Sequence, residues 1–329
     1  MLKNKIITIT GGTGSFGNAS IPILLKEIKP KEIRIFSRDE MKQWDMSLKF
    51  KKLKKLSFII GDVRDKESLN KVFRDTDFVI HAAATKIVPT AEYNPSECIK
   101  TNINGAINVI EAAINNNVKK VVALSTDKAC NPINLYGATK LCSDKLFVTS
   151  NFSSKKQITK FSVVRYGNVM GSRGSVIPFF LSNINENFFT ITDVRMTRFM
   201  IDLDTAVKTV IFALKDSIGG EIFVTKIPSM KVLDIAKTIA MKKIKIIGIR
   251  PGEKLHEQMI SVEDSRYTYE YKDYYKILPA IFDIYKNKKY IKNGRKVSQN
   301  FEYSSNTNNK WLTKTDLQKW LRKNTSSKF

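Results

Sequence analysis

A tyrosine and a lysine, Tyr136 and Lys140, stand four residues apart in a segment with the pattern of a helix. Side chains at this spacing lie on one face of a helix, so we expect the lysine ammonium near the tyrosine phenol. A nearby positive charge favours phenolate and lowers the tyrosine pKa from its ordinary value of about 10. With Thr126 at the end of the preceding strand, the pair predicts proton transfer from an alcohol whose carbon gives up a hydride. Y-x-x-x-K also arises by chance on amphipathic helices.

A glycine-rich turn follows the apolar run at residues 6–10, with the spacing G-x-x-G-x-x-G at Gly11, Gly14 and Gly17. Glycines here permit a tight turn, the close approach of a pyrophosphate and close packing of the next helix. The free N–H groups and the positive end of that helix would then face the phosphates. The pattern indicates a dinucleotide site, and the alternative is an ordinary strand-to-helix turn.

The residues after the second expected strand favour one dinucleotide over the other. Ser37 and Arg38 stand at the strand tip, where an acidic residue would hold the ribose 2′-hydroxyl of NAD. A hydroxyl and a guanidinium suit a 2′-phosphate, and Lys42 lies one turn further on. We therefore expect NADP, while the nearby Asp39 keeps NAD as the alternative. Asp62, after the third strand, could accept from the adenine amino group or cap the next helix.

Strand and helix patterns alternate at short intervals through the first half of the chain. Strands are expected at residues 6–10, 33–36, 57–60, 78–81, 121–124 and 162–165. Helices are expected between them at residues 16–26, 40–49, 66–73, 95–115 and 135–149. In the second half, a loop is expected at residues 171–175, a strand at 221–224 and a polar, partly extended tail at 300–309. Further helices are expected at residues 176–184, 204–214, 232–241 and 314–322.

This alternation implies a parallel sheet with helices on both faces, joined by right-handed crossovers. The expected fold class is α/β, a Rossmann-type doubly wound parallel sheet with a smaller C-terminal substrate-binding lobe. Residues 1–167 and about 197–225 would form the NADP-binding domain, and about 168–196 and 226–329 the substrate-binding domain. Ligands bind such sheets at the carboxyl ends of the strands, which is where the motifs above lie.

Composition excludes several classes of protein. The chain has 329 residues and 42% hydrophobic content, enough for a sizeable core, but no apolar run of the roughly 18 residues that span a bilayer. The net charge of +25 attracts polyanions, yet the lysines are scattered and no nucleic-acid-binding pattern accompanies them. Cys98, Cys130 and Cys142 have no metal-ligand spacing and cannot all pair. We expect a soluble cytoplasmic enzyme for an anionic substrate, without a metal, membrane or specific nucleic-acid partner.

Three of these motifs resemble the extended short-chain dehydrogenase/reductase superfamily: T-G-G-T-G-S-F-G at 10–17, G-D-V-R-D at 61–65 and Y-x-x-x-K at 136–140. Longer stretches resemble one family within it, the inverting UDP-N-acetylglucosamine 4,6-dehydratases that open pseudaminic acid synthesis. These stretches cover residues 81–84, 91–95, 124–129, 131–147, 163–168, 171–176, 195–199, 220–223, 226–231, 247–257, 301–305 and 307–309. Matches this long and ordered are more specific than any single motif.

The resemblance implies that Asp127 and Lys128 supply the acid and base that a dehydratase needs beyond its tyrosine. Carried over from the family, Lys128 takes the C5 proton and Asp127 assists departure of the C6 hydroxyl. An amine is a base only when neutral, so we expect burial or nearby cations to lower the Lys128 pKa from about 10.4. Lys86 and Lys140 are the candidate cations. The alternative is that Asp127 and Lys128 form a solvated ion pair.

The reaction implied is redox-neutral. Tyr136 accepts the C4 hydroxyl proton as hydride leaves C4, Lys128 removes the C5 proton that the 4-ketone acidifies, and water leaves across C5 and C6. Hydride then returns to C6 and a proton reaches C5 on the opposite face. The product would be UDP-2-acetamido-2,6-dideoxy-beta-L-arabino-hex-4-ulose, the first intermediate towards pseudaminic acid on flagellin or a surface glycan. NADP would be tightly bound and recycled within each turnover.

The resemblance also implies the binding residues. Those expected to bind the cofactor are Gly11, Gly14, Ser15, Phe16, Gly17, Ser37, Arg38, Lys42, Asp62, Val63, Ala82, Lys86, Tyr136 and Lys140. Those expected to bind UDP-N-acetylglucosamine are Lys86, Tyr136, Asn168, Ser172, Arg173, Val176, Thr192, Arg195, Met196, Arg250 and Glu253. For Lys86, Arg195 and Arg250 the alternative is an ordinary surface or ion-paired side chain. His81 and His256 are expected to be structural.

The family further implies a homo-oligomer, a dimer or a hexamer, in which the helices at 95–115 and 135–149 pair across a dimer. The chain departs from the common family pattern at positions 85, 87, 90, 200 and 225, and none of these changes removes a proposed catalytic group. Two alternatives stay open. One is a related UDP-sugar dehydratase or epimerase for capsule or O-antigen. The other is a non-catalytic NADP-sensing regulator, against which the intact Tyr136, Lys140 and Asp127-Lys128 argue.

Overall fold

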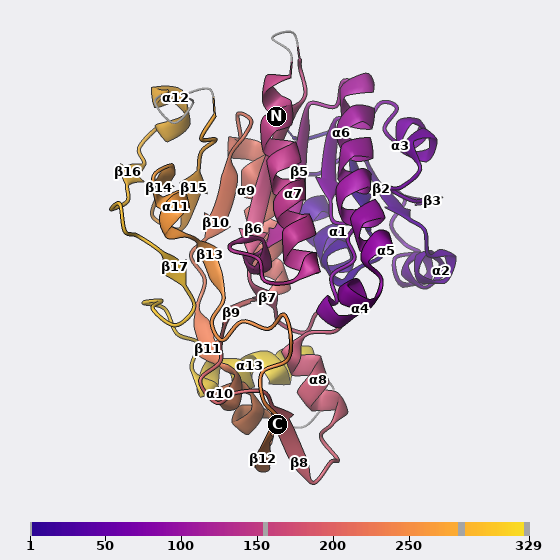
Figure 1. Cartoon of the computed structure of the whole chain (residues 1–329). Coiled ribbons are helices and arrows are strands. Elements are labelled where there is room, and N and C mark those ends of the chain that lie inside the picture. Colours follow the sequence, from indigo (N-terminus) through magenta and orange to yellow (C-terminus); the bar gives the residue numbers. More distant parts are fainter. Residues whose placement is uncertain (1, 154–156, 282–286, 326–329) are drawn as a thin grey trace.

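The computed structural model describes residues 2–153, 157–281 and 287–325, and its largest feature is a ten-stranded sheet (Figure 1). Its parallel strands run in the order β3-β2-β1-β4-β5-β6-β10. They are β1 (Ile6–Thr10), β2 (Glu32–Ser37), β3 (Leu56–Ile60), β4 (Phe78–His81), β5 (Lys120–Thr126), β6 (Lys160–Tyr166) and β10 (Ile222–Thr225). The strand order reverses between β1 and β4, so the expected doubly wound sheet is confirmed.

Helices cover both faces of this sheet (Figure 1). One layer holds α3 (Lys66–Val72), α5 (Pro95–Ile99), α6 (Gly105–Asn115) and α7 (Leu135–Thr149), and the other holds α1 (Ser15–Glu27), α2 (Glu40–Lys49) and α9 (Leu203–Asp216). All five residues of β1, Ile-Ile-Thr-Ile-Thr, are buried, as a parallel strand between two helical layers requires. In the part of the chain that the structure describes, no helix is long and apolar enough to span a membrane.

An antiparallel extension widens the sheet beyond β10. It consists of β15 (Tyr274–Ile277), β14 (Thr268–Glu270) and β16 (Arg295–Lys296), with the short helices α11 (Val262–Ser265) and α12 (Lys288–Ile291) beside it. The sequence does not predict these strands, because they are short and mix polar with apolar residues. The division into two binding domains stays a prediction, and β14, β15 and β16, which fall in the expected substrate-binding domain, continue the large sheet.

A smaller lobe lies below the carboxyl ends of the strands in Figure 1. Its sheets are β7 (Asn168–Val169) with β9 (Thr197–Ile201) and β11 (Ser229–Lys231), and β8 (Phe188–Ile191) with β12 (Lys243–Ile246). Its helices are α8 (Val176–Ser182), α10 (Val232–Ile239) and α13 (Lys314–Asn324). Side chains such as Ile177, Phe180, Ile235 and Leu317 give this lobe an apolar core separate from that of the large sheet. β13 (Gln258–Ile260) and β17 (Tyr303–Ser304) pair between the two.

The expected elements are found, with shifts of a few residues at their ends and two local differences. The helix expected at 95–115 contains a π-helical segment, η1 (Lys100–Asn104), between α5 and α6. There the buried Asn102 side chain bonds both the N–H and the carbonyl of Thr85, and α4 (Val88–Tyr93) follows that contact. β10 starts one residue later than expected, and the Glu221 carboxylate just before it accepts the N–H groups of Ile218 and Gly219.

Candidate active site

The end of β5 and the start of α7 bring the expected reacting residues together. β5 ends at Thr126, and a short 3-10 helix, η2 (Asp127–Ala129), follows it. A Cβ on Gly137 would lie 2.2 Å from the carbonyl oxygen of Lys128, so only glycine lets η2 approach α7 this closely. Lys128 therefore lies against the first turn of the helix that carries Tyr136.

Lys128 is held between two buried carboxylates. Its Nζ lies 3.1 Å from Oδ1 of Asp127 and 2.9 Å from Oε1 of Glu257. Those two side chains expose 1% and 2% of their surface and Lys128 exposes 23%, so the solvated-pair alternative is wrong. Thr126 donates its hydroxyl to Asp127 Oδ1 at 3.0 Å, and Arg198 Nε lies 3.7 Å from Glu257 Oε1.

The charge around Lys128 differs from the expectation. Burial by itself lowers the Lys128 pKa, but the carboxylates of Asp127 and Glu257 outweigh it and hold the pKa above its ordinary value. The expectation that neighbouring cations lower this pKa is therefore wrong for the protein alone. One candidate cation, Lys86, instead donates to the carbonyl oxygen of Arg173 at 2.9 Å. Lys128 is a protonated ammonium at neutral pH in this arrangement.

Tyr136 is buried beside this group. Burial raises the pKa of its phenol to about 12, against the opposing charge of Lys128 and the hydroxyl of Thr126. The expectation that Lys140 lowers the Tyr136 pKa is thus wrong for the protein alone. The cation that acts on the phenol is Lys128, and burial outweighs its effect. Lys140 is itself buried, and burial lowers its pKa.

His81 is structural, as expected. It is buried at the end of β4, and its Nδ1 lies 2.7 Å from the Thr10 hydroxyl. Burial and the nearby Lys140 charge lower its pKa to about 3, so the ring is neutral. His256 lies 2.8 Å from the Thr197 hydroxyl through its Nδ1 and has no contact with the reacting residues in the described chain.

Asp127 is the carboxyl of this site that holds a proton most readily. Burial raises its pKa, Lys128 opposes that shift, and the charge of Glu257 adds to it. Glu257 shifts the other way: burial would raise its pKa, but Lys128 and Arg198 hold it below its ordinary value. One oxygen of each carboxylate, Asp127 Oδ2 and Glu257 Oε2, is buried without a hydrogen-bond partner among the described residues. An uncompensated buried oxygen is costly, so these atoms are suited to a proton or a bound ligand.

The segment 250–257 carries Glu257 to the site from far along the chain. Asn134 Nδ2 donates to the carbonyl oxygen of Gly252 at 2.8 Å, and Lys254 Nζ donates to that of Cys130 at 2.5 Å. These bonds tie the segment to η2 and to the N-cap of α7. The sequence analysis noted the segment but missed Glu257 and Arg198, because no local spacing links either residue to Lys128.

The glycine turn has the shape that a dinucleotide site requires. Gly11 has φ +65°, and a Cβ there would lie 2.7 Å from the backbone of Ala83. A Cβ on Gly17 would lie 1.8 Å from the carbonyl oxygen of Gly12, so α1 packs directly on the turn. No side chain caps α1 at Gly14, which leaves the N–H groups of its first turn available to an anion. Expected cofactor residues beside this turn are Ser15, Phe16 and Ala82.

Cationic and hydroxyl side chains gather where β2 ends. The Ser37 hydroxyl lies 2.9 Å from that of Thr13, while the Arg38 side chain is 63% exposed. Asp39 caps α2 by accepting the Lys42 N–H at 2.9 Å and also pairs with the Lys42 ammonium. Asp39, the acidic side chain that kept NAD as an alternative, is therefore engaged in a helix cap.

Asp62 does not cap the helix that follows it, so that alternative is wrong. Asp65 is the N-cap of α3, and Asp62 instead lies 2.7 Å from the Arg64 guanidinium and 3.7 Å from that of Arg38. The neighbouring Val63 is buried and packs against the start of α6.

Some of the residues expected to bind the sugar nucleotide lie at the glycine turn, and others lie between β7 and α8. Arg173 lies at the glycine turn, where its Nη2 donates to the carbonyl oxygen of Thr13 at 2.9 Å. Asn168 is in β7 beside Met200 of β9, and Ser172 is buried in the turn that leads to Val176, the first residue of α8.

The remaining expected sugar-binding residues pair among themselves or with neighbours. The Thr192 hydroxyl lies 2.9 Å from the sulfur of Met196, and both side chains are buried. Arg195 pairs with Asp193 at 2.7 Å and is 67% exposed. Arg250 pairs with Glu253, and its side chain is 60% exposed. Both guanidiniums are thus accessible to an anion.

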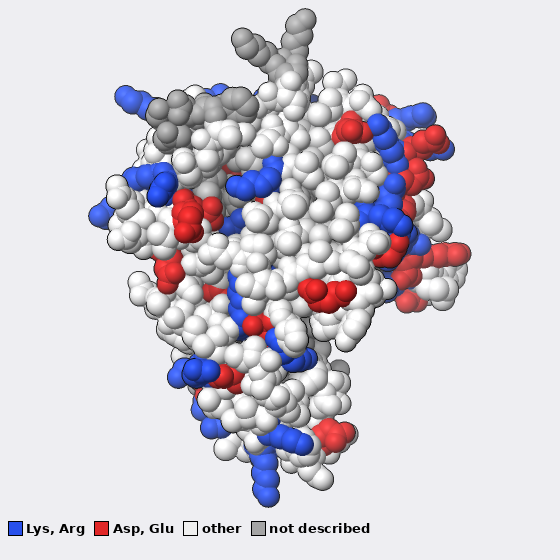
Figure 2. Space-filling model, viewed as in Figure 1, with Lys and Arg blue, Asp and Glu red and all other residues white. Residues whose placement is uncertain are grey.

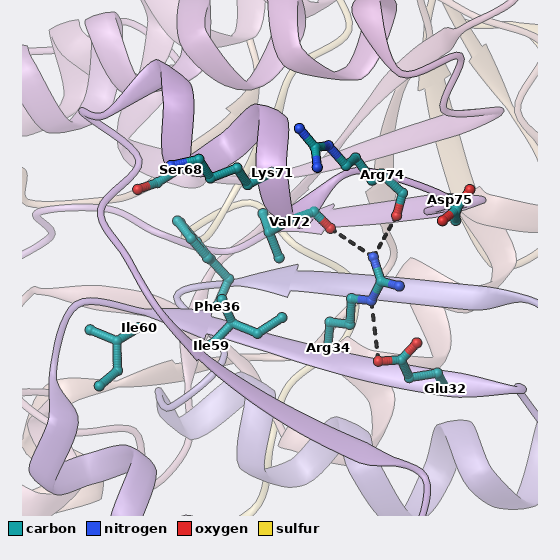
Figure 3. Close-up of a pocket in the computed structure, with 10 residues that line it drawn as sticks. All are labelled: Glu32, Arg34, Phe36, Ile59, Ile60, Ser68, Lys71, Val72, Arg74 and Asp75. Atoms are coloured by element: carbon teal, nitrogen blue, oxygen red, sulfur yellow. Dashed lines mark hydrogen bonds and ion pairs between the residues drawn. The ribbon is translucent and has the colours of Figure 1, made fainter.

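The hollow drawn in Figure 3 lies away from these residues. It sits at the edge of the sheet, where Phe36, Ile59 and Ile60 of β2 and β3 meet Ser68, Lys71 and Val72 of α3. Arg34 crosses its floor and donates to the carbonyl oxygens of Val72 and Arg74. Among the described residues, no three His, Cys, Asp or Glu side chains form a group that could hold a metal ion.

Comparison with known proteins gives one family. The model of the family described as "Polysaccharide biosynthesis protein" matches residues 7–279. An inverting UDP-N-acetylglucosamine 4,6-dehydratase of Campylobacter jejuni is 55% identical over 96% of this chain and 97% of its own. A protein of Rickettsia akari named UDP-glucose 4-epimerase is 43% identical over 98% of this chain and 96% of its own.

Solved structures agree with this fold. The X-ray structure of Pen from Bacillus thuringiensis has a TM-score of 0.88 and 36% identity, and the match covers 98% of this chain and 99% of that one. DesIV of Streptomyces venezuelae, a dTDP-glucose 4,6-dehydratase solved with NAD and TYD bound, has a TM-score of 0.69 and 20% identity over 76% and 86% of the two chains. The second likeness concerns the fold alone.

Proposed function

This chain belongs to the polysaccharide biosynthesis protein family and, within it, to the inverting UDP-N-acetylglucosamine 4,6-dehydratases, and we propose from that premise that it dehydrates UDP-N-acetylglucosamine across C5 and C6 and inverts C5. The observation that carries the proposal is the buried acid–base pair beside the redox tyrosine. Oxidation alone needs only Tyr136, whereas elimination of water needs a further base and acid, which Lys128 and Asp127 supply 3.1 Å apart.

The cofactor in this proposal is NADP, which fits the uncapped N-terminus of α1 and the tight glycine turn. Bound NADP would accept a hydride from the sugar and return it within the same turnover. NADP is favoured over NAD because the Arg38 guanidinium, which is 63% exposed and lies 3.7 Å from the Asp62 carboxylate, can meet a 2′-phosphate, while Asp39 is engaged in its helix cap. Lys140 is buried in the second turn of α7 and would orient the cofactor ribose.

The chain's own residues then carry the proton transfers. Tyr136 takes the proton of the C4 hydroxyl, and Lys128 takes the C5 proton once the C4 ketone has acidified it. Asp127, whose pKa lies above its ordinary value because it is buried, gives a proton to the departing C6 hydroxyl. For this step Lys128 must first lose its own proton, and the closing of the site around the sugar favours that loss by excluding water.

The exposed guanidiniums would hold the substrate's diphosphate end. Arg195 stands on the smaller lobe and Arg250 on the segment 250–257. Their exposed guanidiniums pair with the neighbouring carboxylates of Asp193 and Glu253. Arg173 bonds to the glycine turn at Thr13, and Lys86 bonds to Arg173. Both side chains would contact the cofactor and the sugar nucleotide.

Three further features are part of the same proposal. The product would enter pseudaminic acid synthesis, as the resemblance of the long sequence stretches implies. The enzyme would act in the cytoplasm, which suits the free thiols of Cys98, Cys130 and Cys142. It would form a homo-oligomer through α6 and α7, and Figure 2 shows that the surface over α7 carries few charged side chains.

Incubation with UDP-N-acetylglucosamine in D₂O, followed by NMR, tests this function. We expect a 4-keto-6-deoxy product with deuterium at C5 and the L-arabino configuration, formed without added reductant. A second candidate, a 4-epimerase, is favoured by the 43% identity to the Rickettsia protein. It would give the C4 epimer with no loss of water. Binding of NADP with an unaltered sugar would instead support a regulator.

A further inference from the structure

Glu257 makes the shortest contact to Lys128 in the site, yet no step above uses it. Its Oε1 lies 2.9 Å from Lys128 Nζ, closer than Asp127 Oδ1 at 3.1 Å, and its side chain is 2% exposed. Burying a carboxylate here is costly unless it is paired, and the pair it makes is with the proposed base. The residue comes from a different segment of the chain than the other reacting groups, so the tertiary fold places it there.

We propose that Glu257 is a positioning residue for the dehydration: its carboxylate accepts an N–H of Lys128 in both charge states of the amine, orients the amine lone pair, and sets the pH at which Lys128 becomes neutral. The inference rests on the proposed function, because it concerns the base of that reaction. It adds a role for a residue beyond Asp127, Lys128 and Tyr136.

The orientation follows from the number of protons on the amine. A neutral lysine amine keeps two N–H groups and has one lone pair. When one N–H points at Glu257 Oε1, the lone pair must point elsewhere, and the amine cannot rotate freely. The bond to the Glu257 carboxylate thereby fixes the direction of the lone pair, and abstraction of the C5 proton requires a lone pair held in one direction.

The proton balance uses only groups in contact. In the resting site Lys128 carries three protons. One of them passes from Nζ to Asp127 Oδ1, breaking an N–H bond and forming an O–H bond, and no oxidant or reductant is involved. Asp127 is the acceptor because it is the carboxyl whose pKa lies above its ordinary value, whereas that of Glu257 lies below. Asp127 can then protonate the leaving hydroxyl while Glu257 stays ionised.

The charges facing the pair come from four elements. Asp127 is on η2, Arg198 is on β9, Tyr136 is on α7, and Lys254 lies on the segment before β13. Arg198 and Lys254 help to keep Glu257 ionised, and with Lys128 they set three positive charges against the two carboxylates. Removal of the Glu257 charge increases this excess of positive charge, which favours loss of the Lys128 proton.

Two variants separate charge from position. Glu257→Gln keeps an acceptor oxygen of similar reach but removes the charge, so the rising limb of the pH profile for C5 proton exchange should move to lower pH by about one unit or more. Glu257→Ala removes the acceptor as well as the charge, so the limb should also move to lower pH, and the exchange rate on the plateau above it should fall about tenfold or more. Exchange is measured by NMR in D₂O, and hydride transfer by absorbance at 340 nm. Both variants should slow hydride transfer less than they slow exchange of the C5 proton.

Glu270→Gln is the matched control. It removes a carboxylate that pairs with a lysine, Lys226, at 2.7 Å, but on the antiparallel extension of the sheet. Its pH profile should match that of the unchanged protein. Thermal unfolding and NADP binding show whether each variant is folded, and Glu257→Asp replaces any variant that is not: it keeps the charge but moves the acceptor, so it should lower the exchange rate without moving the limb.

A second measurement does not depend on turnover. The rate at which acetic anhydride acylates Lys128, followed by mass spectrometry against pH, reports the pKa of its amine. Glu257→Gln should move this curve to lower pH, and Glu270→Gln should not. Unmoved acylation and exchange curves in Glu257→Gln would overturn the inference. If the unchanged protein leaves UDP-N-acetylglucosamine intact while the acylation curve still moves, the proposed function fails but the Glu257–Lys128 coupling stands.

Discussion

Neighbouring charges and burial set the pKa values of Lys128 and Tyr136. In the protein alone, neither side chain is in the protonation state that the proposed reaction needs. Lys128 is held as an ammonium by two carboxylates, and the Tyr136 phenol is held neutral by burial. Both shifts oppose the roles proposed for these residues. The positive nicotinamide and the removal of water on ligand binding would therefore be needed to bring the groups to reaction, because buried pKa values respond strongly to added charge.

At the residue scale, Lys128→Ala should abolish exchange of the C5 proton with solvent because no other amine lies in contact with Asp127 and Glu257 among the described residues. NADP should still bind, since Lys128 is not part of the glycine turn. NMR in D₂O measures the exchange, and fluorescence titration measures the binding. Exchange at the rate of the unchanged protein would exclude Lys128 as the base.

A second prediction at this scale concerns the choice of cofactor. Arg38→Ala removes an exposed guanidinium at the end of β2 and should weaken NADP binding about tenfold while leaving NAD binding nearly unchanged. Titration calorimetry with each dinucleotide measures the ratio. Equal weakening of both would mean that Arg38 does not meet the 2′-phosphate.

Among the elements, the contact between η2 and α7 determines the site's geometry. Gly137 in the first turn of α7 leaves room for the Lys128 carbonyl, and the Asn134 cap starts the helix where it does. The π-helical segment η1 presents Asn102 to Thr139 of the same α7 and to Thr85, which joins β4 to this layer. Such segments are frequent near functional sites, where they re-aim a side chain.

Gly137→Ala tests that contact. The added methyl would lie 2.2 Å from the Lys128 oxygen and 3.0 Å from Pro132, so η2 must move away from α7. We expect a loss of turnover of about a hundredfold, since a displacement of about 1 Å has effects of this size. Ala138→Gly is the control: it costs the helix about 1 kcal/mol in propensity without moving η2. Equal activities in the two variants would contradict the role of Gly137.

Asp77 joins three elements at the opposite end of the sheet. Its carboxylate accepts the Ile6 N–H at 3.0 Å and lies 2.7 Å from Lys119 and 3.5 Å from Lys5. Burial would raise its pKa, but the bonds to Lys119 and Ile6 hold it below the ordinary value. A lowered carboxyl pKa adds stability above the unfolded pKa of about 3.9, and this is lost as the pH falls through the folded value.

Asp77→Asn should therefore lower the free energy of unfolding by about 1 to 2 kcal/mol at pH 7. The difference from the unchanged protein should shrink as the pH falls through the lowered pKa of the folded Asp77 carboxyl, because that carboxyl is then protonated in both states. Denaturant unfolding at a series of pH values measures this. A difference that is independent of pH would show that the amide, not the charge, is responsible. Activity should not change, since the site is at the other end of the strands.

For the whole molecule, the large sheet holds the cofactor turn and the reacting residues, and the smaller lobe with the segment 250–257 holds the groups proposed for the sugar. The lobe has its own apolar core, and the two parts meet at the carboxyl ends of the strands. Glu257 crosses that boundary, which makes the site incomplete until both parts are folded.

The proposed dimer is a property at this scale. Ile107 on α6 is 36% exposed and Ile99 on α5 is 39% exposed. Ile107→Glu should lower the mass measured by light scattering to that of a monomer, because a charge cannot be buried there unpaired. Met241→Glu, on an 87% exposed side chain beyond α10, is the control and should leave the assembly intact. Unchanged assembly in Ile107→Glu would place the interface elsewhere.

Local sequence patterns predict the α/β fold and the placement of the proposed reacting residues at the end of β5 and the start of α7. Alternating apolar runs, a glycine turn and Tyr136 four residues before Lys140 are local patterns, and local patterns survive without knowledge of distant contacts. Such patterns do not predict the charge on Lys128, the presence of Glu257 and Arg198 beside it, or the antiparallel strands. Those features depend on which segments meet in space. A pKa in particular responds to burial and to charges from far along the chain, and the packing of the whole chain sets both.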